Sequence, residues 1–268
     1  MKHKFFALGA FILFALSACQ QNGKGSGNPL DETNASTLAG FWIPIDFCTR
    51  SGKAGSVLKA MNNSNKPYAY ALSFNASNPD SITCYNGFET WKMKADYRDD
   101  TLEIKNAHGN LSIYLVYDPK DNKDLTMFDG TSGNTNLNRY ILSKAKVLNG
   151  YEAFLTALNN SMMSGSFRSA GKGGGEVRFG TDGTIKGNKD FDLYQLCTGG
   201  DCAVMSDMDV ITLRNSKKAG SDQMFGYVFS TKKDTLTFYN LINQNPAEKG
   251  NYAVGSVAQT YLKTIAKK

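Results

Sequence analysis

The sequence contains very little histidine, and this shortage excludes several kinds of catalytic site. Only His3 and His108 occur among the 268 residues. His3 falls in a predicted signal peptide, so the mature chain could supply neither a zinc site with two histidines nor a pair of catalytic histidines. A G-x-S-x-G motif, which presents the catalytic serine of many hydrolases, is also missing. We therefore predict a protein that is not an enzyme and that holds no metal or other cofactor.

Long apolar segments and strong clusters of one charge are absent as well. The apolar segment at residues 5–16 is shorter than the roughly 20 residues that span a bilayer. The formal net charge of +6 is spread along the chain, with only a mild basic cluster, KTIAKK, at the C-terminus. This distribution is typical of a solvated surface, and it does not predict nucleic-acid binding.

The N-terminus combines the features of a secretory signal. Lys2 and Lys4 precede the apolar segment, and small residues follow it. The segment ends in LSAC, which resembles the lipobox of bacterial lipoproteins. This resemblance implies cleavage before Cys19, acylation of Cys19 and, because Gln20 follows instead of Asp, sorting to the outer membrane. Two or more acyl chains would hold the protein firmly there. The alternative is an ordinary signal peptide that happens to end in cysteine.

A flexible tether is predicted between the membrane anchor and the folded part. The signal peptide covers residues 1–18, and residues 19–37 are polar and rich in Gly, Asn and Ser. Such a segment has too little apolar surface to form a core of its own. We therefore expect the folded part to begin at residue 38.

From residue 38 onward the chain consists of two similar halves, at 38–146 and 163–268. Three pairs of segments carry the similarity: LAGFW (38–42) with MSGSF (163–167), IYLVYDPKDNKDLTMF (113–128) with MFGYVFSTKKDTLTFY (224–239), and YILSKAK (140–146) with YLKTIAK (261–267). Self-similarity over this length indicates that one structural plan is used twice.

Within each half, hydrophobic residues recur with a period of two. Leu111, Ile113 and Leu115 share one face of a predicted strand, and Phe225 and Tyr227 share a face of another. Turn sequences such as YNG, AHGN and GTDG separate these segments. We predict roughly eight antiparallel strands per half, about the number that closes a small barrel.

The segment at residues 147–162 differs from the rest, because its apolar residues have helical spacing. These residues are Leu148, Tyr151, Phe154, Leu155 and Leu158. We predict a short helix that joins the two halves and packs against one of them.

The pattern of strands resembles the bacterial lipocalin-like domains that are often found on lipoproteins. GFW near the start of the first half and LTMF in its near-terminal strand carry this resemblance. It implies an all-β fold with two tandem small antiparallel barrels, at 38–146 and 163–268, joined by the short helix.

Four cysteines remain once Cys19 is assigned to the lipid anchor: Cys48, Cys84, Cys197 and Cys202. An even number in an oxidising compartment suggests two disulfides. Three connectivities are possible, and we favour Cys48–Cys84 and Cys197–Cys202 because each pair stays within one half. CTGGDC has four residues between its cysteines and therefore is not a thioredoxin-type CxxC motif.

Aromatic side chains are the candidates for a ligand site. If a barrel contains a pocket, we expect its lining to include Tyr68, Tyr70, Trp91 and Tyr114. The alternative is that these residues simply fill the interior.

Two polar motifs have structural interpretations. SAGKGGGE at residues 169–176 lacks the GK[ST] ending of a phosphate-binding loop, so we predict a hairpin loop. The pairs Asp190/Asp192 and Asp207/Asp209 could bind a cation if they converged. We interpret them instead as solvent-facing residues on edge strands.

Taken together, these patterns predict a lipid-anchored lipoprotein of the outer membrane that acts as a binding module. The partner would be a small apolar ligand or another envelope or host protein. The alternatives are an envelope-stress sensor, which would need a redox-labile cysteine pair, and an inhibitor of a hydrolase such as lysozyme. The sequence leaves open the ligand, the oligomeric state, and whether the protein faces the periplasm or the cell surface.

Overall fold

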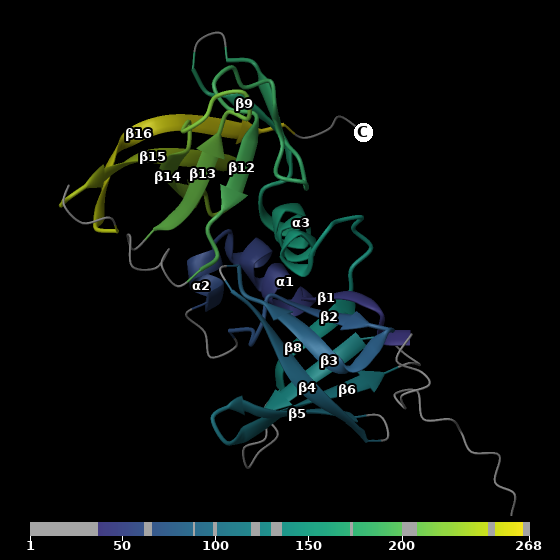
Figure 1. The fold of residues 1–268 in the computed structure, drawn as a ribbon. Coiled ribbons are helices and arrows are strands. Elements are labelled where there is room, and N and C mark those ends of the chain that lie inside the picture. Colours follow the sequence, from purple (N-terminus) through teal and green to yellow (C-terminus); the bar gives the residue numbers. More distant parts are fainter. Residues whose placement is uncertain are drawn as a thin grey trace, which may run out of the picture.

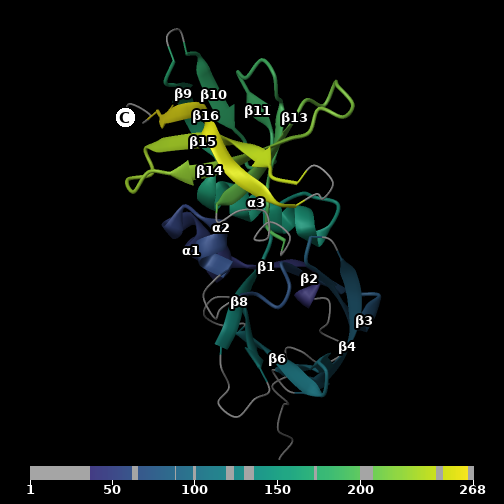
Figure 2. The same ribbon diagram turned by 90° about the vertical axis from the view of Figure 1, so that its left-hand side faces the viewer.

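The computed structural model describes residues 37–61, 66–87, 89–98, 101–118, 124–129, 136–171, 174–199, 208–245 and 250–264. The predicted signal peptide, Cys19, nearly all of the tether and Cys202 lie outside these ranges. Two β-sheet units lie at opposite ends of the molecule, with helices between them (Figure 1). A view from the side gives the same arrangement (Figure 2).

The first unit is a closed antiparallel barrel. Its strands are β1 (Gly40–Pro44), β2 (Ala71–Asn75), β3 (Asn78–Tyr85), β4 (Thr90–Arg98), β5 (Thr101–His108), β6 (Leu111–Asp118), β7 (Asp124–Asp129) and β8 (Asn136–Leu142). Each strand pairs with the next, and β1 closes the barrel on β8 through pairs such as Trp42 with Leu142. Alternation along β6 buries Ile113, Leu115 and Tyr117. The predicted barrel in the first half is therefore confirmed.

The second unit is an eight-stranded antiparallel sheet that does not close. Its strands are β9 (Gly165–Ser169), β10 (Glu176–Phe179), β11 (Ile185–Lys186), β12 (Leu193–Leu196), β13 (Asp209–Arg214), β14 (Gln223–Phe229), β15 (Thr235–Asn243) and β16 (Tyr252–Lys263). The prediction of two closed barrels was therefore wrong for this half. The two edge strands, β11 and β12, are only 2 and 4 residues long. Each pairs with its neighbour on one side, but between the two strands the seam contains only the isolated bridge of Thr184 with Leu193.

Both units nevertheless follow one circular strand order. The first runs β1 to β8, and the second runs β11-β10-β9-β16-β15-β14-β13-β12, which is the same circle opened between its third and fourth strands. The three repeated segments fall on equivalent strands, β1 with β9, β6–β7 with β14–β15, and β8 with β16. Gly40 and Gly165 even share a positive φ, +128° and +145°, at the start of β1 and β9.

Three helices fill the space between the units. α3 (Gly150–Met162) occupies the position at which a helix was predicted. α1 (Ile45–Ala54) and α2 (Val57–Met61) were not predicted, and they lie in the chain between β1 and β2. α1 crosses α3 at Gly52, where a Cβ atom would lie 2.5 Å from the carbonyl oxygen of Ser161. Only glycine allows this close contact between the two helix backbones.

The helices and both sheets share one apolar core. Phe47 of α1, Tyr70 before β2, Phe154 of α3 and Tyr227 of β14 belong to the same buried cluster. The rings of Tyr70 and Phe154 stack with their centroids 4.5 Å apart. The Tyr70 hydroxyl donates a hydrogen bond to the carbonyl of Thr198, next to β12. The two units are therefore held together by continuous packing.

The predicted Cys48–Cys84 disulfide is absent, because both residues are free cysteines. Cys48 lies on α1 in the core between the units, whereas Cys84 lies on β3 inside the barrel. Burial raises the pKa of each thiol to about 12, so neither supplies the reactive thiolate that redox chemistry requires. Cys197 is not among the free cysteines, but Cys202 lies outside the described residues, and the Cys197–Cys202 pairing stays a prediction.

One carboxylate of the second sheet is hydrogen-bonded to helix α2, which lies between β1 and β2 of the first unit. Asp209, at the start of β13, accepts hydrogen bonds from the backbone N–H of Val57 at 2.7 Å and of Leu58 at 2.9 Å. It is only 9% exposed, which corrects its interpretation as a solvent-facing residue. Burial raises the pKa of Asp209 above its usual 3.8, and hydrogen bonds, including those from α2, oppose that rise.

Replacing Asp209 by Ala should destabilise the fold. The two amide groups at the start of α2 would lose their acceptor, and a buried donor without a partner costs about 1–3 kcal/mol. Urea unfolding at pH 7 should show a lower free energy of unfolding by an amount in that range.

Asp209→Asn is the matched control, since it keeps an acceptor oxygen but cannot ionise. The native state binds the Asp209 proton more tightly than the unfolded chain, because its pKa is raised. The contribution of this group to stability is therefore complete below pH 3.8 and declines as the pH rises through the raised pKa. Asn should gain stability relative to Asp over that interval. A constant difference between the two proteins at all pH values would contradict the assignment.

Candidate functional site

A cavity of about 610 Å³ lies between α3 and the second sheet. Three parts of the chain form its walls: α3 with the preceding residues 146–148, the turn at 181–183, and strands β12 and β13. It opens on the outer side of the sheet, not in the interior of either unit. A cavity of this size falls within the range of 300–1,000 Å³ that is usual for small-molecule sites.

Strand alternation explains which side chains of the sheet reach the cavity. Tyr194 and Leu196 of β12 point into the core and are buried, so Leu193 and Gln195 lie on the outer face. The register pairs Leu193 with Arg214 and Gln195 with Thr212 on β13. All four of these outer-face residues line the cavity.

Helix periodicity explains which side chains of α3 reach the cavity. Glu152, Leu155, Thr156 and Asn159 have the spacing of one helix face, and all four line the cavity. A different set of α3 residues, including Phe154 and Leu158, faces the shared core. The helix therefore stabilises the core with one face and forms a cavity wall with another.

The cavity has an apolar wall and charged side chains. Val147, Leu148, Leu155 and Leu193 form the apolar part. Leu148 is 91% exposed, although it is a large hydrophobic residue. A molecule that covered Leu148 would remove this apolar surface from water, at roughly 25 cal/mol per Å². The charged lining residues are Lys146, Glu152, Asp182 and Arg214.

The start of α3 fixes the residues at the cavity mouth. The Asn149 side chain caps the helix by accepting from the backbone N–H of Glu152 at 2.9 Å. The Glu152 carboxylate in turn accepts from the backbone N–H of Leu148 at 3.0 Å. The pair of bonds resembles a capping box, except that the Glu152 carboxylate binds the N–H of Leu148, one residue before the N-cap Asn149, and it fixes the Leu148 backbone beside the cavity.

Asn159 joins the helix to the turn at 181–183. Its side-chain N–H donates to the carbonyl of Thr181 at 3.1 Å. Its Oδ1 atom is buried and has no hydrogen-bond partner in the described part of the chain. Sequence reasoning missed Asn159, although its place on the same helix face as Glu152 and Leu155 was the available signal.

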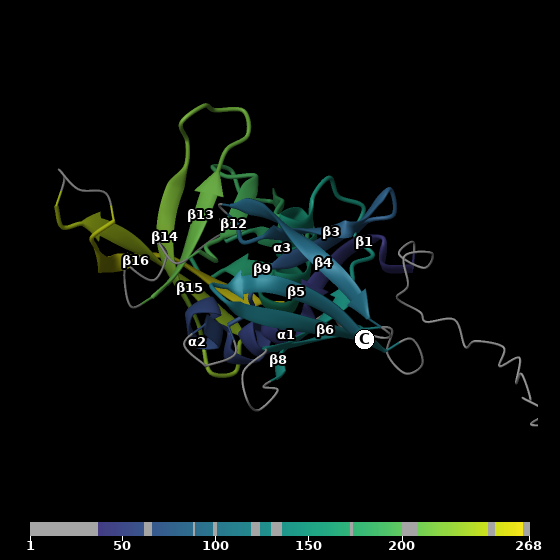
Figure 3. The same cartoon turned by 60° about the horizontal axis from the view of Figure 1, so that its bottom comes forward.

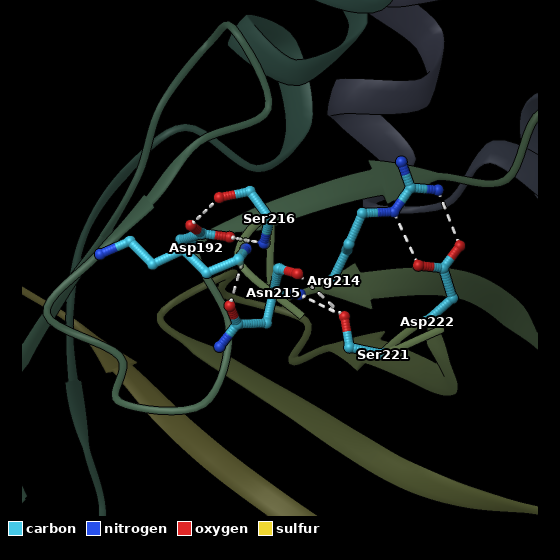
Figure 4. A network of polar contacts seen from close by, with 7 residues as sticks. Asp192, Arg214, Asn215, Ser216, Ser221 and Asp222 are labelled. Atoms are coloured by element: carbon cyan, nitrogen blue, oxygen red, sulfur yellow. Dashed lines mark hydrogen bonds and ion pairs between the residues drawn. The ribbon is translucent and has the colours of Figure 1, made fainter. Parts of the chain in front are cut away.

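A polar network fixes Arg214 at the edge of the cavity (Figure 4). Its Nε and Nη2 atoms each donate to Asp222 at 2.7 Å, in a two-point contact. This hydrogen-bonded pair lowers the pKa of Asp222 and raises that of Arg214. Both side chains are about half exposed, so the pair orients the guanidinium more than it stabilises the fold.

Neighbouring residues of the same network hold the β13–β14 turn. Asp192 accepts from the backbone N–H of Ser216 at 2.7 Å and from its hydroxyl. These bonds lower the pKa of Asp192. The backbone N–H of Asn215 donates to the Ser221 hydroxyl at 2.9 Å. Asp192 therefore has a structural role in this turn, and the structure gives it no cation-binding partner among the described residues.

The four aromatic residues predicted to line a ligand pocket do not converge. Tyr68 and Trp91 meet edge to face at 5.7 Å, and the Trp91 ring N–H donates to the Tyr68 hydroxyl at 3.3 Å. Tyr70 points into the core between the units. Tyr114 lies on the outer face of β6, since its neighbours Ile113 and Leu115 point inward. Tyr68 and Tyr70 share the lining of a small hollow of about 140 Å³.

Large side chains occupy the interior of the barrel. Trp42 and Tyr140 are essentially inaccessible to solvent, and the Tyr140 hydroxyl donates to the carbonyl of Ala69 at 2.8 Å. They belong to a buried cluster that also contains Leu72, Leu115 and Met127. Aromatic residues in this unit therefore contribute mainly to packing.

The described residues contain no group of three or more His, Cys, Asp or Glu side chains that could hold a metal ion. β9 and β10, which flank the Gly-rich segment 169–176, pair antiparallel, and the backbone N–H of Ser169 donates to the carbonyl of Gly175; residues 172 and 173 of the predicted hairpin loop lie outside the described ranges. No helix within the described ranges is long and apolar enough to span a membrane. No protein family, curated protein or solved structure matches this chain.

Replacing Arg214 by Gln should raise the pKa of Asp222 toward its usual value. Arg214 is the main cause of the lowered pKa, whereas the pKa of Asp192 is lowered mainly by Ser216 and should stay unchanged. The carboxyl carbon shifts of both residues, followed by NMR over the acid range, measure the two effects. An unchanged Asp222 titration would show that the pair does not form in solution.

Proposed function

We propose that this protein is a lipid-anchored lipoprotein of the bacterial outer membrane that binds a small, largely apolar ligand in the cavity beside α3. The cavity of about 610 Å³ is the observation that carries the proposal. It can enclose a molecule of ordinary metabolite or lipid-fragment size. The closed barrel is compatible with a lipocalin-like relationship, but its interior is packed, so the ligand site lies outside the barrel.

The chemistry of the lining supports an apolar ligand with a polar end. Val147, Leu148, Leu155 and Leu193 offer apolar surface, and burying it would provide most of the binding free energy. Lys146 and Arg214 carry positive charge, and Glu152 and Asp182 carry negative charge, so the lining has no net formal charge. The polar side chains would then orient the ligand, as they do in most small-molecule sites.

The scaffold would act as a rigid holder. The cavity walls belong to α3 and to β12–β13, and the shared core fixes these elements relative to one another. A preformed site avoids the cost of ordering loops when the ligand binds. Binding and release would therefore require little rearrangement of the two sheets.

Filling the cavity should abolish ligand binding. Thr212→Trp places a large ring among the lining residues, whereas Thr83→Trp introduces the same ring on barrel strand β3, away from the cavity. Native mass spectrometry of the mature, unlipidated 19–268 chain, purified without detergent from a bacterial periplasm, should show a discrete added mass. The Thr83→Trp protein should keep that mass and the Thr212→Trp protein should lose it.

Two outcomes would contradict the proposal. A bare mass for the unsubstituted chain would show that no ligand is carried, and the search would move to protein partners. An added mass that survives Thr212→Trp would place the ligand elsewhere. Equal melting temperatures of the two Trp variants would exclude a general loss of folding as the cause.

Lipid attachment should depend on Cys19 alone. The LSAC sequence at residues 16–19 supports acylation of this thiol. In a bacterial host, a clickable palmitate analogue should label the full-length protein and the Cys202→Ser variant. The Cys19→Ser variant should carry no label. Label that persists in Cys19→Ser, or that is absent from the full-length protein, would rule out this anchor.

A further inference from the structure

Arg214 lines the cavity with part of its guanidinium unused. Its Nε and Nη2 atoms each donate to Asp222 at 2.7 Å. This contact leaves both N–H groups of Nη1 and one of Nη2, and none of the described residues accepts a hydrogen bond from them. In Figure 4 the remaining nitrogen, Nη1, points away from Asp222. The free end of the guanidinium can therefore donate to a second anion.

The sheet separates Arg214 from the acidic turn of the cavity wall. Figure 3 shows β12 and β13 side by side, with α3 next to them. Arg214 of β13 pairs with Leu193 of β12, and Leu193 forms the bridge with Thr184 on its other side. The turn at 181–183 therefore lies across β12 from Arg214, at a distance of about 10 Å for two strand spacings. Asp222 draws the Arg214 side chain the other way, toward the start of β14. An anion bound at Arg214 would thus lie well away from the carboxylate in that turn.

The two acids of the lining already accept hydrogen bonds from the protein. Glu152 accepts from the backbone N–H of Leu148 at 3.0 Å. Asp182 accepts from the hydroxyl of Thr184 at 2.7 Å and from its backbone N–H at 3.1 Å, and the bond from the hydroxyl is the main cause of the lowered pKa of Asp182. Lys146, by contrast, is exposed, and its ammonium group makes no ion pair or hydrogen bond within the described ranges. The two cations of the lining therefore have donors left for a ligand.

We propose that the ligand of the cavity is an acidic amphiphile, an apolar chain that ends in one carboxylate. The carboxylate would accept hydrogen bonds from the free end of Arg214, because the planar fork of a guanidinium matches two carboxylate oxygens. The ammonium group of Lys146 would supply positive charge in the same lining, since Asp222 already neutralises the charge of Arg214. The chain would cover Leu148, which is 91% exposed, and continue along the apolar wall.

A carboxylate head fits this lining better than a neutral or a cationic head. Hydrogen bonds between ionised groups are roughly twice as strong as those between neutral groups. A hydroxyl head would gain less from Arg214 and nothing from the charge of Lys146. A cationic head would have to compete with the donors that Glu152 and Asp182 already have. The inference rests on the proposed function, because it assigns a class of ligand to the same cavity.

Calorimetric titration of the mature unlipidated 19–268 chain at pH 7.5, stripped of any carried ligand, tests the inference. Decanoate, decan-1-ol and decyltrimethylammonium share one apolar chain and carry a negative, a neutral and a positive head. Decanoate should bind about tenfold more tightly than decan-1-ol, and decyltrimethylammonium should bind most weakly. Arg214→Gln and Lys146→Gln should each weaken decanoate binding about fivefold more than they weaken decan-1-ol binding. Lys144→Gln is the matched control, since Lys144 is exposed on the same segment as Lys146 and does not line the cavity.

The three compounds separate failure of this inference from failure of the proposed function. Equal affinity for decanoate and decan-1-ol, or tightest binding of decyltrimethylammonium, would overturn the inference and leave the cavity as a ligand site. Binding of none of the three would overturn both. Decanoate binding that survives Thr212→Trp, or that falls equally with Lys144→Gln and Lys146→Gln, would show that the acid does not bind as proposed. If Arg214→Gln fails to fold, the two lysine variants and the ranking of the three compounds decide.

Discussion

The close contact between α1 and α3 determines how the two sheet units are placed. At Gly52 the helix backbones approach so closely that a methyl group would clash with the carbonyl of Ser161. This contact sets the position of α3, and α3 carries Phe154 into the shared core on one side and Leu155 to the cavity on another. Without a glycine at this position, the helices would separate, and both the core and the cavity would change shape. The second sheet is tied to the same place through Asp209, which caps α2.

The cavity is lined by side chains that follow two different periods, that of strand β12 and that of helix α3. The period of two along β12 brings Leu193 and Gln195 to the outer face of the sheet, and the helical period along α3 brings Glu152 and Asn159 to the facing side. Most of the core side chains come from the alternate residues, Tyr194 and Leu196 on β12 and Phe154 and Leu158 on α3, although Leu155 contacts both the core and the cavity. The structure can therefore be stable while these outer side chains remain available for other contacts.

The sequence allowed part of this to be predicted, and the physical reasons for the limits are specific. Strand alternation and the repeated segments depend on local spacing, so the first barrel and the equivalence of the halves were within reach. That the second sheet stays open could not be predicted. Closure depends on β11, a strand of only two residues, and so short a segment has no alternation of its own that would predict its pairing. The burial of Asp209 and the separation of Cys48 from Cys84 depend on long-range packing. The polar cavity residues, such as Glu152 and Asn159, were missed because their spacing on the helix is also that of an ordinary solvated face.

The seam in the second sheet lies next to the cavity. Gly183 is close to β11 on one side of the seam, and Leu193 belongs to β12 on the other, and both line the cavity. Between these edges the sheet is joined by a single isolated bridge at Thr184. A molecule bound in the cavity would therefore contact both edges of the seam. It would add to the two backbone hydrogen bonds that already cross this line, from Ile185 to Asp192 and from Tyr194 to Gly183, each 2.7 Å long.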